Sequence, residues 1–253
     1  MKNYKNAIEK IRNLPPCLPK TEDDSIYTTI YNQRNHWKPE GRIKLLLLAE
    51  SHVFTSKEDH KITVNNDYVF PKGSNQYTKF IYCLGHGEPE LLSPLPEIIG
   101  RTPQFWKIFY GLFHDLSLQR NNRSIPVLIG HNPNLKNRLN EKIELLKKMK
   151  KNGIWLLDAS PVAIAGNDPC MRRCYYRDIL RISANEYLKP LIENMQPERV
   201  LIIGREVSRI ITPILDLKDS HTIPQPTAFL NAEAKRQLFS DVYKIGQQAM
   251  KHG

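Results

Sequence analysis

Two apolar runs of the sequence end in side chains that can do acid–base and hydrogen-bonding chemistry. "RIKLLLLAE" ends on Glu50 and is followed directly by Ser51 and His52, and "GIWLLDASP" carries Asp158 and Ser160 at its end. A carboxylate can orient a water molecule or stabilise a cation, and an imidazole can donate or accept a proton. Because open α/β sheets keep their ligands at the carboxyl ends of the strands, we expect a site at these two exits.

A proline-stiffened segment near the C-terminus could contact a nucleic acid. In "TIPQPTAFLNAEAKR" the rings of Pro224 and Pro226 exclude helix, and Phe229 precedes Lys235 and Arg236. An apolar tip beside cations is suited to wedging into a duplex while its backbone is held. A capped helix with a core phenylalanine is the alternative reading of the same residues.

The elements that must position these residues alternate between strands and helices. Apolar runs without interruption are typical of strands covered on both faces, and helical spacing fills most of the segments between them. This alternation predicts an α/β fold, a three-layer α/β/α sandwich with a central, mostly parallel four-stranded sheet. We expect one domain over residues 1–253 with an N-terminal helical extension over residues 1–40. Helices are predicted over residues 102–116, 132–153, 173–195, 205–215 and 231–251.

The charge of the chain favours an acidic partner. Its 37 lysines and arginines exceed its 26 aspartates and glutamates, which gives a formal net charge of +11. DNA or RNA fits this charge because cations that neutralise phosphates release counterions; a solvated basic surface is the alternative. No segment is apolar enough to span a membrane, and the N-terminus lacks the apolar core of a signal peptide, so we expect a cytoplasmic protein.

The cysteines do not indicate a metal site. Cys170 and Cys174 would share one face of a helix, but no Cys-x-x-Cys pair and no histidine cluster accompanies them. Ordinary thiols are therefore favoured over a metal or cluster. We expect neither metal nor cofactor.

The strand exits, taken in order, resemble the motifs of the uracil-DNA glycosylase superfamily. Glu50 takes the place of the glutamate in the branch that carries a Gly-Glu-Ala-Pro-Gly motif. Asp158 stands where the family has a base-recognising asparagine. "Ile223-Pro224-Gln225-Pro226" is similar to the family's His-Pro-Ser-Pro motif, which precedes an intercalating loop, although Ile223 replaces the histidine.

The resemblance implies a monomeric DNA glycosylase that flips a base out of the stack and hydrolyses its N-glycosidic bond, leaving an abasic site. Glu50 would position the attacking water, and either His52 or His221 would stabilise the departing base. The resemblance assigns two further sets of side chains. Those expected to bind the flipped base are Phe54, Tyr82, Asp158 and Ser160, and those expected to contact duplex or single-stranded DNA are Gln225, Thr227, Phe229, Lys235 and Arg236.

Asp158 bears on which base is removed. A carboxylate accepts a hydrogen bond from the N4 amino group of cytosine, whereas it faces the O4 of uracil poorly. The hypothesis is therefore a modified cytosine rather than uracil, with possible removal of modified bases from phage DNA in defence. The alternative is that Asp158 caps a helix or pairs with an arginine.

Two other functions fit the same residues. Ser51 could be the nucleophile of a hydrolase with His52 as its base, although adjacent residues on an extended segment point apart. The chain could also be a nucleic-acid-binding protein without catalytic activity, because the motif histidine is missing.

Overall fold

The structure is a computed structural model of the chain. It describes residues 1–14, 21–65, 75–95, 104–118, 125–164, 166, 169, 171–217, 219–226 and 228–251, with the backbone alone at position 172. The expected contact of Thr227 and the cysteines at positions 17 and 170 lie outside the described residues.

A four-stranded sheet with all neighbours parallel forms the centre of the fold, in the order β4-β1-β5-β6. Leu47 of β1 lies opposite Leu156 of β4 and Leu201 of β5, so the most apolar strand is also an inner one. All five residues of β1 are buried, as its apolar sequence requires. The bounds are Leu45–Ala49 for β1, Ile154–Asp158 for β4, Arg199–Ile203 for β5 and Ser220–Ile223 for β6.

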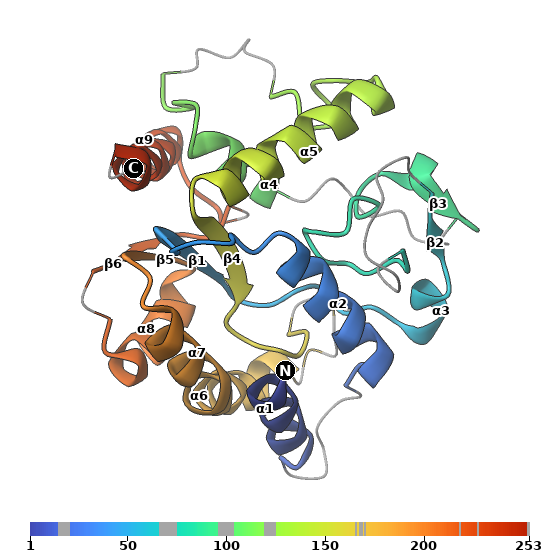
Figure 1. The fold of residues 1–253 in the computed structure, drawn as a ribbon, viewed down its shortest axis with the longest axis vertical. Helices are drawn as coiled ribbons and strands as arrows, with labels where there is room; N and C mark the ends of the chain where they lie inside the picture. Colours follow the sequence, from blue (N-terminus) through green and yellow to red (C-terminus); the bar gives the residue numbers. More distant parts are fainter. Residues whose placement is uncertain are drawn as a thin grey trace.

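Helices cover both faces of the sheet. Figure 1 shows α1, α6, α7 and α8 on one side of it and α4, α5 and α9 on the other, consistent with a three-layer sandwich. A two-stranded antiparallel sheet, Thr63–Val64 (β2) with Leu92–Ser93 (β3), lies apart from the central one. The helices are α1 Lys2–Arg12, α2 Asp24–His36, α3 Lys57–His60, α4 Phe105–Gly111, α5 Leu135–Lys151, α6 Tyr176–Ser183, α7 Lys189–Met195, α8 Arg205–Leu215 and α9 Ala232–Lys251, with short helical turns η1 Pro89–Leu91, η2 Met171–Tyr175 and η3 Ala184–Leu188.

Local signals account for several helix ends. Asn134 caps α5 by accepting the N–H of Asn137 at 2.9 Å. Gly153, just past its end, has φ +70, and a Cβ there would lie 2.8 Å from the carbonyl oxygen of Arg42. The helix predicted over residues 132–153 is thus confirmed, whereas the one predicted to extend to position 116 ends at Gly111.

The N-terminal helices are part of the core. Tyr4 and Ile11 of α1, and Ile26 and Ile30 of α2, are buried in the same apolar cluster as the central strands. Residues 1–40, expected to be an N-terminal helical extension, thus contribute two helices to the apolar core. Within the described residues, no helix combines the length and the apolar composition needed to cross a membrane.

Candidate functional site

Glu50 and Gln225 meet at the carboxyl edge of the sheet although they are 175 residues apart in the chain. The side-chain amide of Gln225 donates to Oε2 of Glu50 at 3.2 Å, and the hydroxyl of Tyr176 donates to the same oxygen at 2.9 Å. The backbone carbonyl of Glu50 accepts the N–H of Ser160 at 2.9 Å. The segments after β1 and β6 thus meet at the carboxylate of Glu50, and the segment after β4 bonds to its backbone.

A glycine explains how Gln225 reaches this place. Gly204, at the end of β5, has φ +123 and donates its N–H to the carbonyl of Ile223 at 2.8 Å. A Cβ at Gly204 would lie 3.4 Å from Cγ of Gln225 and in a backbone conformation that other residues rarely adopt. The glycine therefore lets the segment after β6 pack closely across the end of β5.

His52 does not face the site but lies between two carboxylates. Its Nε2 is 2.7 Å from Oε2 of Glu22, and its Nδ1 is 3.4 Å from Oδ2 of Asp158. The imidazole is fully buried. Among the residues that the structure describes, no hydrogen bond of good geometry reaches Nδ1 of His52 or Oδ2 of Asp158, so this second contact is an electrostatic one.

The two carboxylates keep His52 charged. Burial alone would lower the pKa of the imidazole, but Glu22 and Asp158 outweigh burial and raise this pKa to about 9. The ring is therefore protonated at neutral pH with both N–H groups directed at carboxylates. The role predicted for His52, stabilising a departing base, is not supported by these contacts.

Glu22 is a residue that the sequence reasoning missed. It is 3% exposed, and its carboxylate accepts the backbone N–H of Thr55 at 2.9 Å and that of Ala163 at 3.3 Å, besides contacting His52. It thereby ties the segment before α2 to the loops after β1 and β4. Its setting, "KTEDD", is an acidic stretch of the kind found on surfaces, and nothing in that pattern signals burial.

Asp158 is turned away from solvent. It is 2% exposed, faces His52, and contributes to the raised pKa of the Arg34 guanidinium, which is also fully buried. The alternative reading, a pairing of Asp158 with an arginine, agrees with this electrostatic contact better than base recognition does. The buried position therefore removes the support that Asp158 gave to a cytosine-type substrate.

Two further residues assigned to base binding belong to the core. The hydroxyl of Ser160 donates to the carbonyl of Val162 at 2.7 Å and accepts the N–H of the same residue, which closes a tight turn. Tyr82 is 1% exposed, and its hydroxyl accepts the N–H of Leu156 at 3.0 Å. Phe54 alone of this predicted set, at the end of the β1 exit loop, is half-buried.

His221 lies too early in β6 to assist at the site. It pairs in register with Leu201, three positions before Gly204, and strands rise about 3.3 Å per residue, so it is about 10 Å short of the sheet edge. Its imidazole is exposed and lies 3.3 Å from a carboxylate oxygen of Asp219. The position of His221 therefore does not support the catalytic role predicted for it.

Of the residues predicted to contact DNA, Phe229, Lys235 and Arg236 lie on the surface beyond β6, whereas Gln225 is half-buried and donates a hydrogen bond to Glu50. Phe229 is fully exposed, and Lys235 and Arg236 are exposed in the first turns of α9. Lys107 of α4 lies close enough to Lys235 for their charges to interact. Burial, and then the charge of Lys235, lower the pKa of the Lys107 ammonium group. Lys107, Lys235 and Arg236 are here called the basic cluster, and the last two follow Phe229 by six and seven residues in the chain.

Ser51 and His52 do not form a nucleophile–base pair. The hydroxyl of Ser51 donates to the carbonyl of His52 at 2.9 Å and accepts the N–H of Ile164 at 3.0 Å. Both ring nitrogens of His52 face carboxylates instead. A serine hydrolase built on these residues is not supported.

The described cysteines give no sign of a metal centre. Cys83 is buried, whereas Cys174 is exposed. Over the ranges that the structure describes, no three His, Cys, Asp or Glu side chains are grouped so that they could hold an ion.

Comparison with known proteins leaves the family open. No protein-family model, no curated protein and no solved structure matches the chain. The resemblance to glycosylases therefore depends on the sequence motifs alone.

Proposed function

We propose that the protein is a monofunctional DNA glycosylase that flips a damaged or modified pyrimidine out of DNA and hydrolyses its N-glycosidic bond. The observation that carries this proposal is the contact between Glu50 and Gln225. It supports the view that the first and last motifs of the resemblance act at one place. No cofactor is needed for such a hydrolysis.

Glu50 is suited to the chemistry. Breaking an N-glycosidic bond develops positive charge on the sugar, which a nearby carboxylate stabilises. The oxygen of a water molecule bonds to the anomeric carbon, the electron pair of the broken bond leaves with the base, and Glu50 accepts the proton of the water. Tyr176 and Gln225 both donate to Oε2 of Glu50, which fixes the orientation of the carboxylate.

Access to Glu50 requires a movement. The residue is 6% exposed, and four surface hollows of about 330 to 860 Å³ are lined by other residues. Gln225 lies on a half-buried segment between two prolines, so its side chain is the group that would leave when a nucleoside enters. The flipped nucleoside would then contact the carboxylate of Glu50 in place of the Gln225 amide.

The surface beyond β6 would hold the duplex. Phe229 would enter the space that the flipped base vacates, and the basic cluster would neutralise phosphates on either side. The formal net charge of +11 is consistent with such a partner.

The contacts of the predicted base-binding and catalytic residues do not select one base as the substrate. Asp158 is directed at His52, and neither predicted histidine reaches the site, so the leaving base would depend on backbone N–H groups for stabilisation. A preference for modified cytosine over uracil, and a role in defence against phage, stay predictions.

The test is a panel of oligonucleotide duplexes that contain uracil or modified cytosines, heated in alkali after incubation with the protein. We expect strand cleavage at one class of base, loss of cleavage with Glu50→Gln, and normal cleavage with Glu9→Gln, a surface carboxylate on α1. If no duplex is cleaved while DNA is bound tightly, the protein is a binder without catalytic activity.

A further inference from the structure

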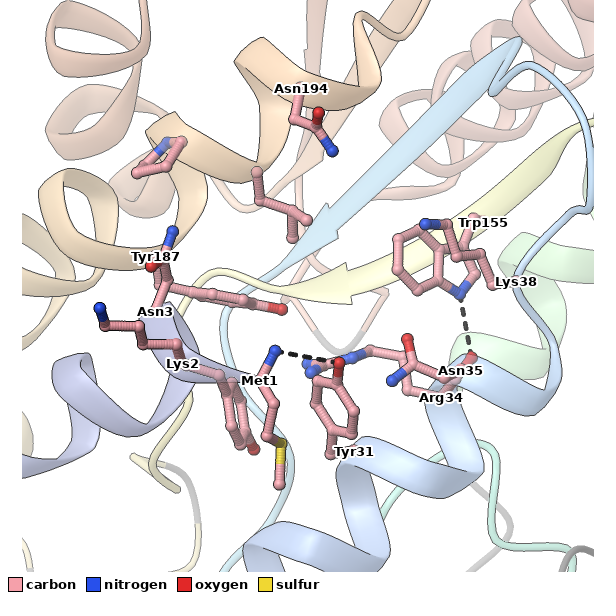
Figure 2. A pocket seen from close by; sticks show the side chains of 13 residues that line it. Met1, Lys2, Asn3, Tyr31, Arg34, Asn35, Lys38, Trp155, Tyr187 and Asn194 are labelled. Atoms are coloured by element: carbon pink, nitrogen blue, oxygen red, sulfur yellow. Dashed lines mark hydrogen bonds between the residues drawn. The ribbon is translucent and has the colours of Figure 1, made fainter.

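A hollow of about 330 Å³ lies at the β4 edge of the sheet, between α1, α2 and the segment that ends in α7. Figure 2 shows the side chains that surround it, with Arg34, Tyr31 and Tyr187 close together at its floor and Lys38 and Trp155 to one side. Lys2, Arg34 and Lys38 contribute cations, and none of its described lining residues is an aspartate or glutamate. The hollow is therefore strongly positive.

Two of the three guanidinium nitrogens of Arg34 are buried without an acceptor in the described part of the chain. Arg34 is 1% exposed, and among the described residues its Nε and Nη1 have no hydrogen-bond partner. Its guanidinium carbon lies over the rings of Tyr4, Tyr31 and Tyr187, at 4.9, 5.6 and 5.6 Å from their centroids. Such contacts use the aromatic faces, whereas the N–H groups of the guanidinium point outward in its own plane and still need oxygen acceptors.

The surroundings keep Arg34 charged and keep the tyrosine hydroxyls as donors. Burial lowers the pKa of Arg34, but nearby tyrosines and Asp158 outweigh it and raise this pKa. Burial raises the pKa of the Tyr187 hydroxyl to about 12, so Tyr187 keeps its proton. Asp158, the carboxylate that acts on Arg34, faces His52 through its own Oδ2.

We propose that this hollow binds a small phosphate monoester of about the size of a nucleoside monophosphate. The phosphate oxygens would meet the ammonium groups of Lys2 and Lys38, and they would reach the buried, unpartnered N–H groups of Arg34 once the rings around the guanidinium move apart. The organic group would lie against Leu191 and the edge of Trp155. The volume exceeds what a phosphate ion fills and lies at the lower end of the range of about 300–1,000 Å³ that is typical of ligand pockets.

This ligand is distinct from the DNA of the proposed function. Trp155 is on β4 and Phe229 follows β6, and these are the two outer strands of the sheet. A duplex held beside Phe229 and the basic cluster would therefore lie at the opposite edge from the hollow. The inference does not depend on glycosylase activity.

The test is isothermal titration of the full chain, without DNA, with adenosine 5′-monophosphate, inorganic phosphate and adenosine. We expect one saturable site for the monophosphate, weaker binding of phosphate and no binding of adenosine. Lys2→Gln and Lys38→Gln should each weaken binding of the monophosphate about tenfold, because each removes a charge-assisted hydrogen bond. Lys5→Gln is the matched control, since Lys5 is exposed on the same helix as Lys2 and lies outside the hollow.

Four results would overturn the inference. The first two are a lack of saturable binding of the monophosphate, and a loss of affinity in Lys5→Gln equal to that in the Lys2 and Lys38 variants. The third is binding of inorganic phosphate as tight as that of the monophosphate. The fourth is displacement of the monophosphate by an oligonucleotide, which would make a nucleic acid the ligand. The lysine variants keep the test decisive even if replacing the buried Arg34 prevents folding, and their melting temperatures check that they fold.

Discussion

Glu22 and His52 lie 2.7 Å apart, both fully buried, and join the start of α2 to the exit of β1. Asp158, at the end of β4, lies 3.4 Å from the other nitrogen of the same imidazole. A buried charge is tolerated only when it is paired, and here one cation lies between two carboxylates. The charge of His52 therefore holds together three segments that border the candidate site.

The stability of the protein should fall as the pH rises above neutrality. Burial lowers the pKa of His52 but its carboxylate neighbours raise it to about 9, above its ordinary value of 6.5. A group whose pKa is higher in the folded state stabilises the fold fully at a pH below its pKa in the unfolded state. This stabilisation is lost as the pH rises through its pKa in the folded state. We expect the free energy of unfolding to drop by up to about 3 kcal/mol between about pH 6.5 and 9. Urea unfolding across that range measures it.

The control for this pH effect is His52→Gln, which removes the titrating group. The variant should be less stable than the natural protein near pH 6.5 and should show a flatter dependence on pH above it. An equally steep decline in His52→Gln would mean that another group is responsible.

Replacing Phe229 with alanine should weaken base removal from a duplex without affecting the fold. The ring is fully exposed, so its loss should change the free energy of unfolding by less than about 0.5 kcal/mol. We expect a roughly tenfold slower reaction on duplex DNA and a smaller effect on a single strand, where no stack has to be opened. Leu118→Ala, at another exposed apolar residue, is the matched control and should react like the natural protein.

Glu88 should be among the most sensitive positions for stability. Its fully buried carboxylate accepts hydrogen bonds from Nε of Arg138 at 3.0 and 3.1 Å and from the ammonium of Lys142, both also fully buried. Glu88→Gln leaves Lys142 without its carboxylate partner and leaves Arg138 with only the half-exposed Glu90, at 3.6 Å, which should cost about 3–5 kcal/mol in urea unfolding. Glu144→Gln, which breaks an exposed pair with Lys147, should cost less than about 1 kcal/mol. Equal losses in both variants would contradict this account of the buried charges.

The sheet could be predicted because burial on two faces leaves a mark on the sequence. The run from Leu45 to Leu48 has no polar interruption, and the strands that flank it, which begin at Ile154 and Arg199, show nearly the same pattern. Their parallel direction follows from the helices between them. The glycosylase-like identity of the fold does not follow from these features.

The site could be predicted only in part. Glu50 and Gln225 follow strands, and strand ends of a parallel sheet meet at one edge, but the motif resemblance assigned Gln225 to DNA rather than to Glu50. The role of Glu22 was not foreseeable, because its burial results from partners 30 to 141 residues away in the chain. Tyr82 shows the opposite difficulty: an aromatic residue that walls a pocket and one that fills a core have the same sequence signature.

The most direct test of the central claim compares base release by the natural protein and by Glu50→Gln under single-turnover conditions, with the free base measured by mass spectrometry. We predict that the variant releases base at least about 100-fold more slowly while its affinity for the same DNA stays within about twofold. An unchanged rate, or a loss of rate matched by an equal loss of affinity, would contradict a catalytic role for Glu50.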